Sequence, residues 1–349
     1  MENGTRIPFA GLDDKNRERA KRFFAAYPTA VGVSDSPTPE FLGTKSPRRC
    51  RFCHGVRPNV KFKDNAHVLP QFMGNKNLRS YFECQSCNAR FSKYEHSFAR
   101  FIGASRTLSQ IPGSSNKVPT HEDAANKLKL QMGEHALQLI FDGEHKSYAV
   151  DLGNKELTIK TIRHSYVPIH LLKVLVKIGL SLLDEEEVAE YELARRFILN
   201  DELDALLAGN PMLHLYFYSL PGPVWFPSPV AQLCYLAPDC ADPLPGKQIV
   251  LYYGNYCFQL AMPFGSADTA RLLGKTVQLP RFPLLLNQEK LRQFGDYREV
   301  SADFTSAARR KEEPHEIICS FTEYIQVDSD ENEEDTLRKY GHWPLSEVS

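Results

Sequence analysis

Two neighbouring segments with different hydrophobic patterns are the clearest helical signals in the chain. In residues 169–183, "IHLLKVLVKIGLSLL", apolar side chains occur nearly all round a helical wheel, which predicts a buried helix. Residues 185–199, "EEEVAEYELARRFIL", have one apolar face and acidic residues in the first turn. This second pattern predicts a surface helix packed beside the buried one.

Segments rich in branched and aromatic residues lie on both sides of these helices. "HALQLIFDG", "KSYAVDL" and "ELTIKTI" are separated by short turns with Gly, Asp and Asn, which predicts an antiparallel meander. From residue 212 onward, "MLHLYFYSL", "VAQLCYL", "KQIVLYYG" and "YCFQLAMPF" predict further strands. We therefore expect an α+β domain over residues 131–327, of a fold that the pattern does not identify.

Pro-, Gly- and Ser-containing stretches divide the rest of the chain. Residues 1–45 are interpreted as an N-terminal helix, over 13–27, followed by a linker, and 113–130 as a second linker. Between them lies a compact basic module, residues 46–112. Acidic residues crowd the start of a tail, 328–349, which predicts a solvated segment; a regulatory arm that mimics phosphate is the alternative.

Composition is that of a soluble globular protein with room for two domains: 349 residues, 42% hydrophobic, with a net charge of −1. The charge is uneven, because residues 48–101 carry eleven basic and three acidic side chains. Such a basic region is expected where phosphates bind. No apolar run is long enough for a signal peptide or a membrane helix, so we expect a cytoplasmic protein with no membrane partner.

Four of the eight cysteines form two CxxC pairs, Cys50 with Cys53 and Cys84 with Cys87, separated by thirty residues. Tetrahedral zinc is commonly held by two such pairs from separate turns. This spacing predicts a structural Zn²⁺ that stabilises the module and has no open coordination position for catalysis. The other four cysteines are interpreted as ordinary buried thiols.

Between and after the cysteines, the module has a strand signal and a helix signal. "NVKFKDNAHVLPQF" predicts a short strand that runs toward His67 and ends at Pro70. "NARFSKYEHSFARFIG" predicts a helix, because aromatic residues recur at steps of three and four: Phe91, Tyr94, Phe98 and Phe101. The expected order is strand, turn, strand, helix.

These motifs together resemble a known family. "CRFC", "AHVLPQFMGNK", "CQSCN" and "FSKYEHSFARF" follow one another as in HNH endonucleases, which have a ββα-metal fold, here with a treble-clef-like four-cysteine zinc site. The resemblance covers about residues 48–104. It implies a metal-dependent nuclease that hydrolyses phosphodiester bonds, with DNA as the expected substrate, and by analogy a role in phage defence or restriction.

The resemblance also implies roles for individual residues. His67 would be the general base that takes a proton from water. Asn88 would brace the active-site loop or orient His67. One catalytic Mg²⁺ or Mn²⁺ would stabilise charge on the scissile phosphate.

One position departs from the family pattern. Many HNH enzymes have an acid directly before the basic histidine, where this chain has Ala66. Asp64 lies two residues earlier and so on the same face of a strand. Glu95 and His96 lie on the following helix, and either could supply the remaining catalytic or metal-binding group. Glu95 is favoured because hard cations prefer carboxylate oxygen.

Four basic residues near the proposed site, Lys76, Arg79, Arg90 and Lys93, are candidate nucleic-acid contacts. The rival hypothesis is a zinc-stapled module that binds nucleic acid or protein without cutting, and Ala66 favours it. For residues 131–327 we expect a sensing, target-binding or oligomerising role, through a second copy or a regulatory partner, that restrains or recruits the nuclease.

Overall fold

The structure is a computed structural model that describes residues 11–63, 66–113, 115–133, 136–141, 147–204 and 209–324. Within these residues the fold is α+β, with mainly antiparallel sheets. The α-helices are α1 (Asp14–Ala26), α2 (Gln85–Ile102), α3 (Ser105–Leu108), α4 (Pro168–Leu182), α5 (Glu192–Leu199), α6 (Ser266–Leu272) and α7 (Gln288–Arg292).

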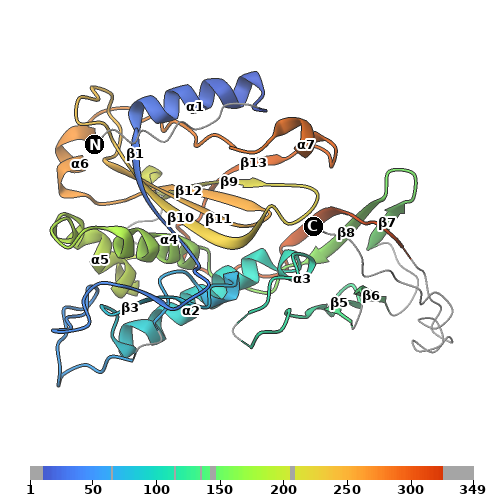
Figure 1. Ribbon diagram of the computed structural model, residues 1–349, viewed down its shortest axis with the longest axis horizontal. Helices are drawn as coiled ribbons and strands as arrows, with labels where there is room; N and C mark the ends of the chain where they lie inside the picture. The colour runs from blue at the N-terminus through green and yellow to red at the C-terminus, as the bar shows by residue number, and fades with distance from the viewer. Residues whose placement is uncertain are drawn as a thin grey trace.

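A six-stranded antiparallel sheet forms the centre of the molecule (Figure 1). Its strands, in spatial order, are β1 (Thr29–Ser34), β10 (Phe226–Tyr235), β11 (Lys247–Gly254), β12 (Tyr256–Ala261), β9 (His214–Ser219) and β13 (Arg298–Asp303). The strands predicted from residue 212 onward are therefore confirmed as the inner strands of one sheet. Their aromatic and branched side chains suit a sheet that is covered on both faces.

Side chains on β11 alternate between two hydrophobic cores. Ile249 and Leu251 belong to the core on the α4 side, and Val250 and Tyr252 to the core beneath α1. Figure 1 shows α1 on one face of the sheet and α4 on the other. This alternation is the period of two that a strand imposes, and it divides the molecule into layers.

Helix α4 confirms the predicted buried helix, because all its residues except His170 are buried. It lies close to the sheet at Gly179, where an added Cβ would stand 2.7 Å from the Cδ1 atom of Ile249. Two lysines, Lys173 and Lys177, are also buried on this helix. Buried lysines need anionic or carbonyl partners, so they indicate where polar contacts join the layers.

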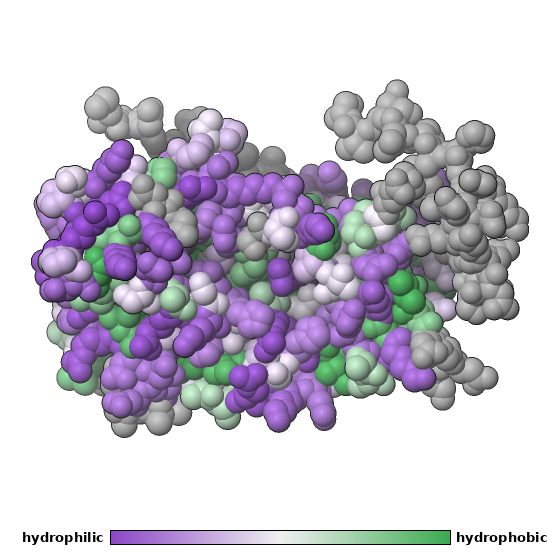
Figure 2. Space-filling model, turned by 90° about the horizontal axis from the view of Figure 1, so that it is seen from below, coloured by the Kyte–Doolittle hydropathy of each residue, from purple (hydrophilic) through white to green (hydrophobic). Residues whose placement is uncertain are grey.

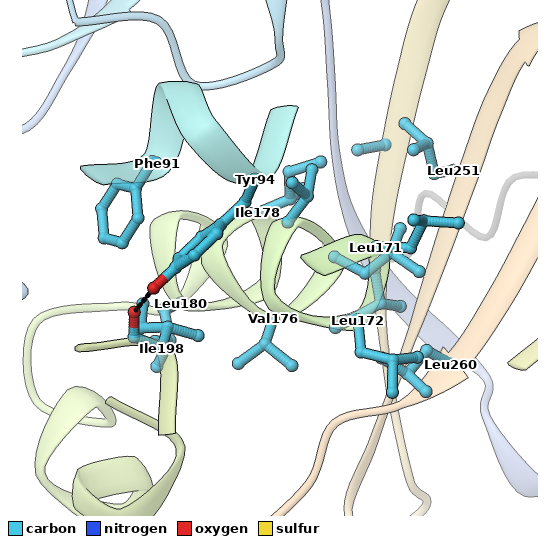
Figure 3. Close-up of a cluster of buried hydrophobic side chains, with 14 of the residues drawn as sticks. Phe91, Tyr94, Leu171, Leu172, Val176, Ile178, Leu180, Ile198, Leu251 and Leu260 are labelled. Carbon is cyan, nitrogen blue, oxygen red and sulfur yellow. Dashed lines mark hydrogen bonds between the residues drawn. The ribbon is translucent and has the colours of Figure 1, made fainter. Parts of the chain in front are cut away.

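Helix α2 packs against α4, and its C-terminal half also contacts the central sheet, where the rings of Phe98 and Phe258 lie 5.1 Å apart. Its predicted stripe is confirmed, with Phe91, Tyr94, Phe98 and Phe101 all at most 2% exposed. In Figure 3, Phe91 and Tyr94 lie above α4, and the Tyr94 hydroxyl donates to the carbonyl of Ile198 at 3.2 Å. The basic module therefore shares one continuous hydrophobic core with α4 and the central sheet.

Three smaller sheets complete the fold. Strand β2 (Glu40–Leu42) pairs in parallel with β3 (Leu78–Ser80). The two antiparallel sheets, each in spatial order, are β4 (His121–Asp123), β5 (Leu128–Met132) and β6 (Leu137–Phe141), and β14 (Pro314–Ser320), β8 (Glu156–Ile162) and β7 (Tyr148–Asp151). The predicted meander is thus divided, because β6 pairs with β5 while β7 and β8 pair with a strand from the far end of the chain.

Both segments interpreted as linkers contain regular structure. Residues 28–45 include β1, which extends the central sheet by pairing with β10, and residues 113–130 include β4 and the start of β5. β1 is largely exposed, so it lacks the apolar pattern that identifies inner strands. An edge strand is held mainly by backbone hydrogen bonds, to which side-chain patterns are a poor guide.

The predicted surface helix over residues 185–199 is shorter than expected: a 3₁₀ turn, Val188–Tyr191, precedes α5. The acidic tail, 328–349, lies outside the described residues. None of the described helices combines the length and apolar character needed to cross a bilayer. Figure 2 shows mostly hydrophilic residues over the lower face, with hydrophobic residues in separate small areas.

Candidate metal centre and the surrounding site

The four cysteines of the two CxxC pairs come together at the start of α2. Cys50 and Cys53 lie in a turn closed by the Cys50 amide, which donates to Gly55 at 2.8 Å. Cys84 is the N-cap residue of α2 and Cys87 lies in its first turn. All four sulfur atoms lie within 4.8 Å of one another.

The sulfur positions fit a tetrahedral zinc site. The Cys50–Cys87 and Cys53–Cys84 sulfur separations are 3.8 and 3.6 Å. Zn–S bonds of about 2.3 Å in a tetrahedron place sulfurs about 3.8 Å apart. The donor set and spacing are therefore consistent with the predicted structural Zn²⁺, which Cys50, Cys53, Cys84 and Cys87 would hold. Within the described ranges, no other group of three or more His, Cys, Asp or Glu side chains is close enough to share an ion.

His67 lies near this centre, in an isolated antiparallel bridge with Arg79 of β3. The predicted strand toward His67 is thus reduced to this bridge and the contacts on either side of it, such as the Ser80 amide donating to Ala66 at 2.9 Å. His67 is 7% exposed, and its Nε2 is 2.9 Å from the amide nitrogen of Gln71. Its Nδ1 is buried with no hydrogen-bond partner among the described residues.

The surroundings of His67 keep its imidazole neutral. Burial, followed by the charges of Arg79 and Lys177, lowers its pKa to about 4, against a smaller opposing effect of Asp35. A neutral imidazole can accept a proton, which a general base must do. The Gln71 side chain is bonded to Nε2, but Gln71 is itself exposed, so its side chain can rotate away.

Lys177 of α4, which no sequence pattern singled out, joins the candidate catalytic region to the central layers. Its ammonium donates to the carbonyl oxygens of His67 and Val68 and lies 3.4 Å from Glu83 and 4.0 Å from Glu95. Burial raises the pKa of Glu83 to about 7 and also raises the pKa of Glu95. Lys177 is therefore a fixed positive charge among four oxygen acceptors.

Bracing contacts of the kind expected of Asn88 are made by Asn75. The buried Asn75 amide donates to the carbonyls of Leu69 and Leu78, at 2.6 and 3.0 Å, and accepts from the Leu78 amide at 3.0 Å. It thus closes the loop between His67 and β3. Asn88 lies half-buried in the first turn of α2, and its contacts are those of the helix backbone. The GNK string that includes Asn75 was a signal for this role.

The two described candidates on α2, Glu95 and His96, are not brought together. Glu95 is 21% exposed at its side chain and faces Lys177. The next residue, His96, is exposed and lines a separate cavity at the other side of α2. Asp64 lies outside the described residues. The catalytic Mg²⁺ or Mn²⁺ therefore stays a prediction.

The candidate nucleic-acid contacts lie on the surface of the module, each in its own setting. Lys76 donates to Asn116 at 2.8 Å, Arg90 lies 3.5 Å from the carboxylate of Asp201, and Lys93 is exposed on α2. These exposed interactions are weak enough to be exchanged for phosphate contacts.

Comparison of the chain with protein-family models, curated proteins and solved structures finds no match.

Proposed function

We propose that this chain is a metal-dependent endonuclease of the HNH type that hydrolyses phosphodiester bonds, with DNA as substrate. The supporting observation is the pairing of His67 with Arg79 beside the four-cysteine centre and helix α2. A neutral imidazole and a guanidinium on adjacent backbone segments offer a base and a phosphate contact within one short hairpin-like turn.

In the proposed reaction, His67 accepts a proton from the attacking water while Arg79 binds the scissile phosphate. The water oxygen forms the new bond to phosphorus as the bond to the leaving oxygen breaks. A phosphate anion beside Arg79 offsets part of its charge and so raises the pKa of His67, although burial, the largest cause of the lowered pKa, still acts on it. His67 thus becomes a stronger base when substrate is bound. A divalent ion, when bound, supplies Lewis-acid stabilisation of the leaving oxygen.

A second candidate function, a zinc-stapled module that binds nucleic acid without cutting, is favoured by Lys177. Its ammonium already lies between Glu83 and Glu95, where a catalytic cation would seek carboxylate oxygens. Ala66, at the position where an acid often precedes the histidine, is buried and offers no ligand atom. A divalent ion at Glu95 would have to compete with this lysine.

The deciding experiment is cleavage of supercoiled plasmid and of single-stranded DNA by the full-length protein with Mg²⁺ or Mn²⁺. We expect nicking by the wild type, loss of at least a hundredfold in rate in His67→Ala, because a positioned base contributes about 10²–10⁴-fold, and loss on adding EDTA. His214→Ala, on the central sheet, is the matched control and should cut normally. Zinc content is measured throughout, so that loss of the structural ion is not mistaken for loss of the catalytic one.

If no divalent ion supports cutting of either substrate, while the zinc-loaded protein retards DNA in a gel, the binding module replaces the nuclease as the proposal. If His67→Ala cuts as fast as the wild type, the assignment of the base is wrong. If the wild type does cut, comparing Glu95→Ala with His96→Ala tests which residue of α2 contributes to the reaction.

A further inference from the structure

A cavity of about 260 Å³ lies at the C-terminal half of α2, bounded by α3, by β4 and by the residues that follow β8. It is lined by three histidines and two arginines, and by no acidic residue: His96, His121, His164, Arg100 and Arg106. The two guanidinium groups bring positive charge to the hollow with no acidic side chain in its lining, so an anion there would be favourable.

The electrostatics of the lining agree with this composition. The pKa of His96 is lowered by burial and then by Arg100, Arg106 and His164. Burial lowers the pKa of His121 to about 4, with His164 the next contribution. The lining groups thus oppose each other's protonation, and an anion in the cavity would reverse this effect.

His121 is the most deeply buried of the five, at 2% exposed, and its ring lies 5.0 Å from that of His164. The Thr161 hydroxyl donates its only hydrogen to Asp123 at 2.8 Å, so at 2.9 Å it must accept from Nε2 of His121. The Nδ1 atom has no hydrogen-bond partner among the described residues. Protonation of His121 would therefore add a donor at Nδ1.

The two arginines are held in place but retain unused donors. Arg100 uses one nitrogen to donate to the carbonyl of Ser165 at 3.2 Å. The guanidinium carbon of Arg106 lies 5.3 Å from the centre of the Phe72 ring and the group also hydrogen-bonds to Tyr253, while its Nε is buried without a hydrogen-bond partner in the described part of the chain. Guanidinium groups with free N–H donors are the preferred partners of phosphate oxygens.

We propose that this cavity binds the phosphate group of a small phosphorylated molecule such as a nucleoside monophosphate. Its lining supplies positive charge from two arginines and up to three imidazoles, and its volume leaves room for a phosphate group. The site is separate from His67 and from the four cysteines. It therefore does not depend on the proposed nuclease activity.

The test is calorimetric titration of the full-length protein with inorganic phosphate and with adenosine monophosphate at low salt and pH 6.5. We expect both to bind, and binding to weaken at least tenfold in His164→Glu, which places a carboxylate beside His121, and in Arg106→Gln. Lys275→Glu, at an exposed position beyond α6, is the control. It also makes the chain more negative, yet it should leave binding unchanged.

The proposal is overturned if neither phosphate nor adenosine monophosphate binds at up to roughly 10 mM, weaker than any specific site of interest, or if His164→Glu binds as the wild type does. His164 is exposed, so that variant should fold even if Arg106→Gln does not. A 12-nucleotide single strand without terminal phosphate is titrated in parallel. If it competes with adenosine monophosphate and its binding is lost in His164→Glu, the cavity belongs to a nucleic-acid backbone and the small-molecule assignment is wrong.

Discussion

Charged side chains are partnered differently at the two ends of helix α2. At the N-terminal half, the Lys177 ammonium is surrounded by the carbonyls of His67 and Val68 and the carboxylates of Glu83 and Glu95. At the C-terminal half, the cavity lined by Arg100, Arg106 and three histidines contains no acid. At the N-terminal end the lysine has carboxylate and carbonyl partners, whereas the C-terminal end has an excess of basic side chains.

This difference separates stabilising charge from charge available to a ligand. A buried lysine with four oxygen partners is part of the fold, since removing it leaves carboxylates buried without a counter-charge. A basic lining without acids contributes little to folding and leaves its donors for an anion. Ionisable groups with shifted pKa values therefore indicate folding contacts at one end of α2 and an anion site at the other. The following experiments test this difference, from the largest expected effect to the smallest.

Removal of the predicted zinc should affect the N-terminal end most. Structural zinc in small peptides contributes about 10–16 kcal/mol, so Cys84→Ser should lose stoichiometric zinc and destabilise the protein more than any other change considered. The matched control is Cys319→Ser, at a half-buried cysteine remote from the centre. Zinc analysis and urea unfolding measure the effect. Equal zinc content and stability in the two variants would contradict a zinc centre.

Replacing Lys177 should be the next largest effect. Lys177→Met leaves Glu83 and Glu95 without their counter-charge, and breaking a buried pair costs about 3–5 kcal/mol. Lys173→Met, one turn earlier on α4, is the control: it faces Asp204, which is buried, and Asp201, which is 63% exposed at its side chain. The exposed partner can be hydrated, so this loss should be smaller. If urea unfolding shows a larger loss of stability in Lys173→Met than in Lys177→Met, the interpretation of Lys177 and its oxygen partners as a stabilising cluster is refuted.

Lowering the pH should produce a smaller loss, and at both ends. The folded-state pKa of His67 and of His121 is about 4, below the ordinary 6.5. The unfolded chain therefore takes up protons first, so stability is full above pH 6.5 and falls as the pH drops from 6.5 toward 4. For each histidine the loss is about 2 kcal/mol at pH 5.

Urea unfolding at pH 7 and pH 5 measures this loss, with His121→Gln as the comparison. The glutamine can still donate to Thr161, yet it does not titrate, so its pH dependence should be smaller than that of the wild type. Inorganic phosphate should reduce the wild-type loss at the cavity end alone. The same pH dependence in wild type and His121→Gln would show that His121 is not held neutral by the fold.

Several features of the fold could be predicted because their signals are local. The CxxC pairs, the aromatic stripe of α2 and the apolar α4 each follow from the spacing of residues within one short segment. Asn75 has loop-bracing contacts that the sequence did not assign to it, and the role expected of Asn88 stays a prediction. Asn75 and Asn88 are both polar residues beside the site, and only the loop geometry shows that Asn75 lies within reach of the carbonyls it contacts.

The sequence by itself therefore determined the four-cysteine cluster and the α+β character of the chain, because period and spacing act over a few residues. Tertiary structure alone decided that β1 pairs with β10, two hundred residues away, and that Lys177 lies beside Glu83 and Glu95. It also decided that His121 and His164 meet α2 around one cavity. Charge compensation depends on distances between remote segments, and no local pattern of residues encodes those distances.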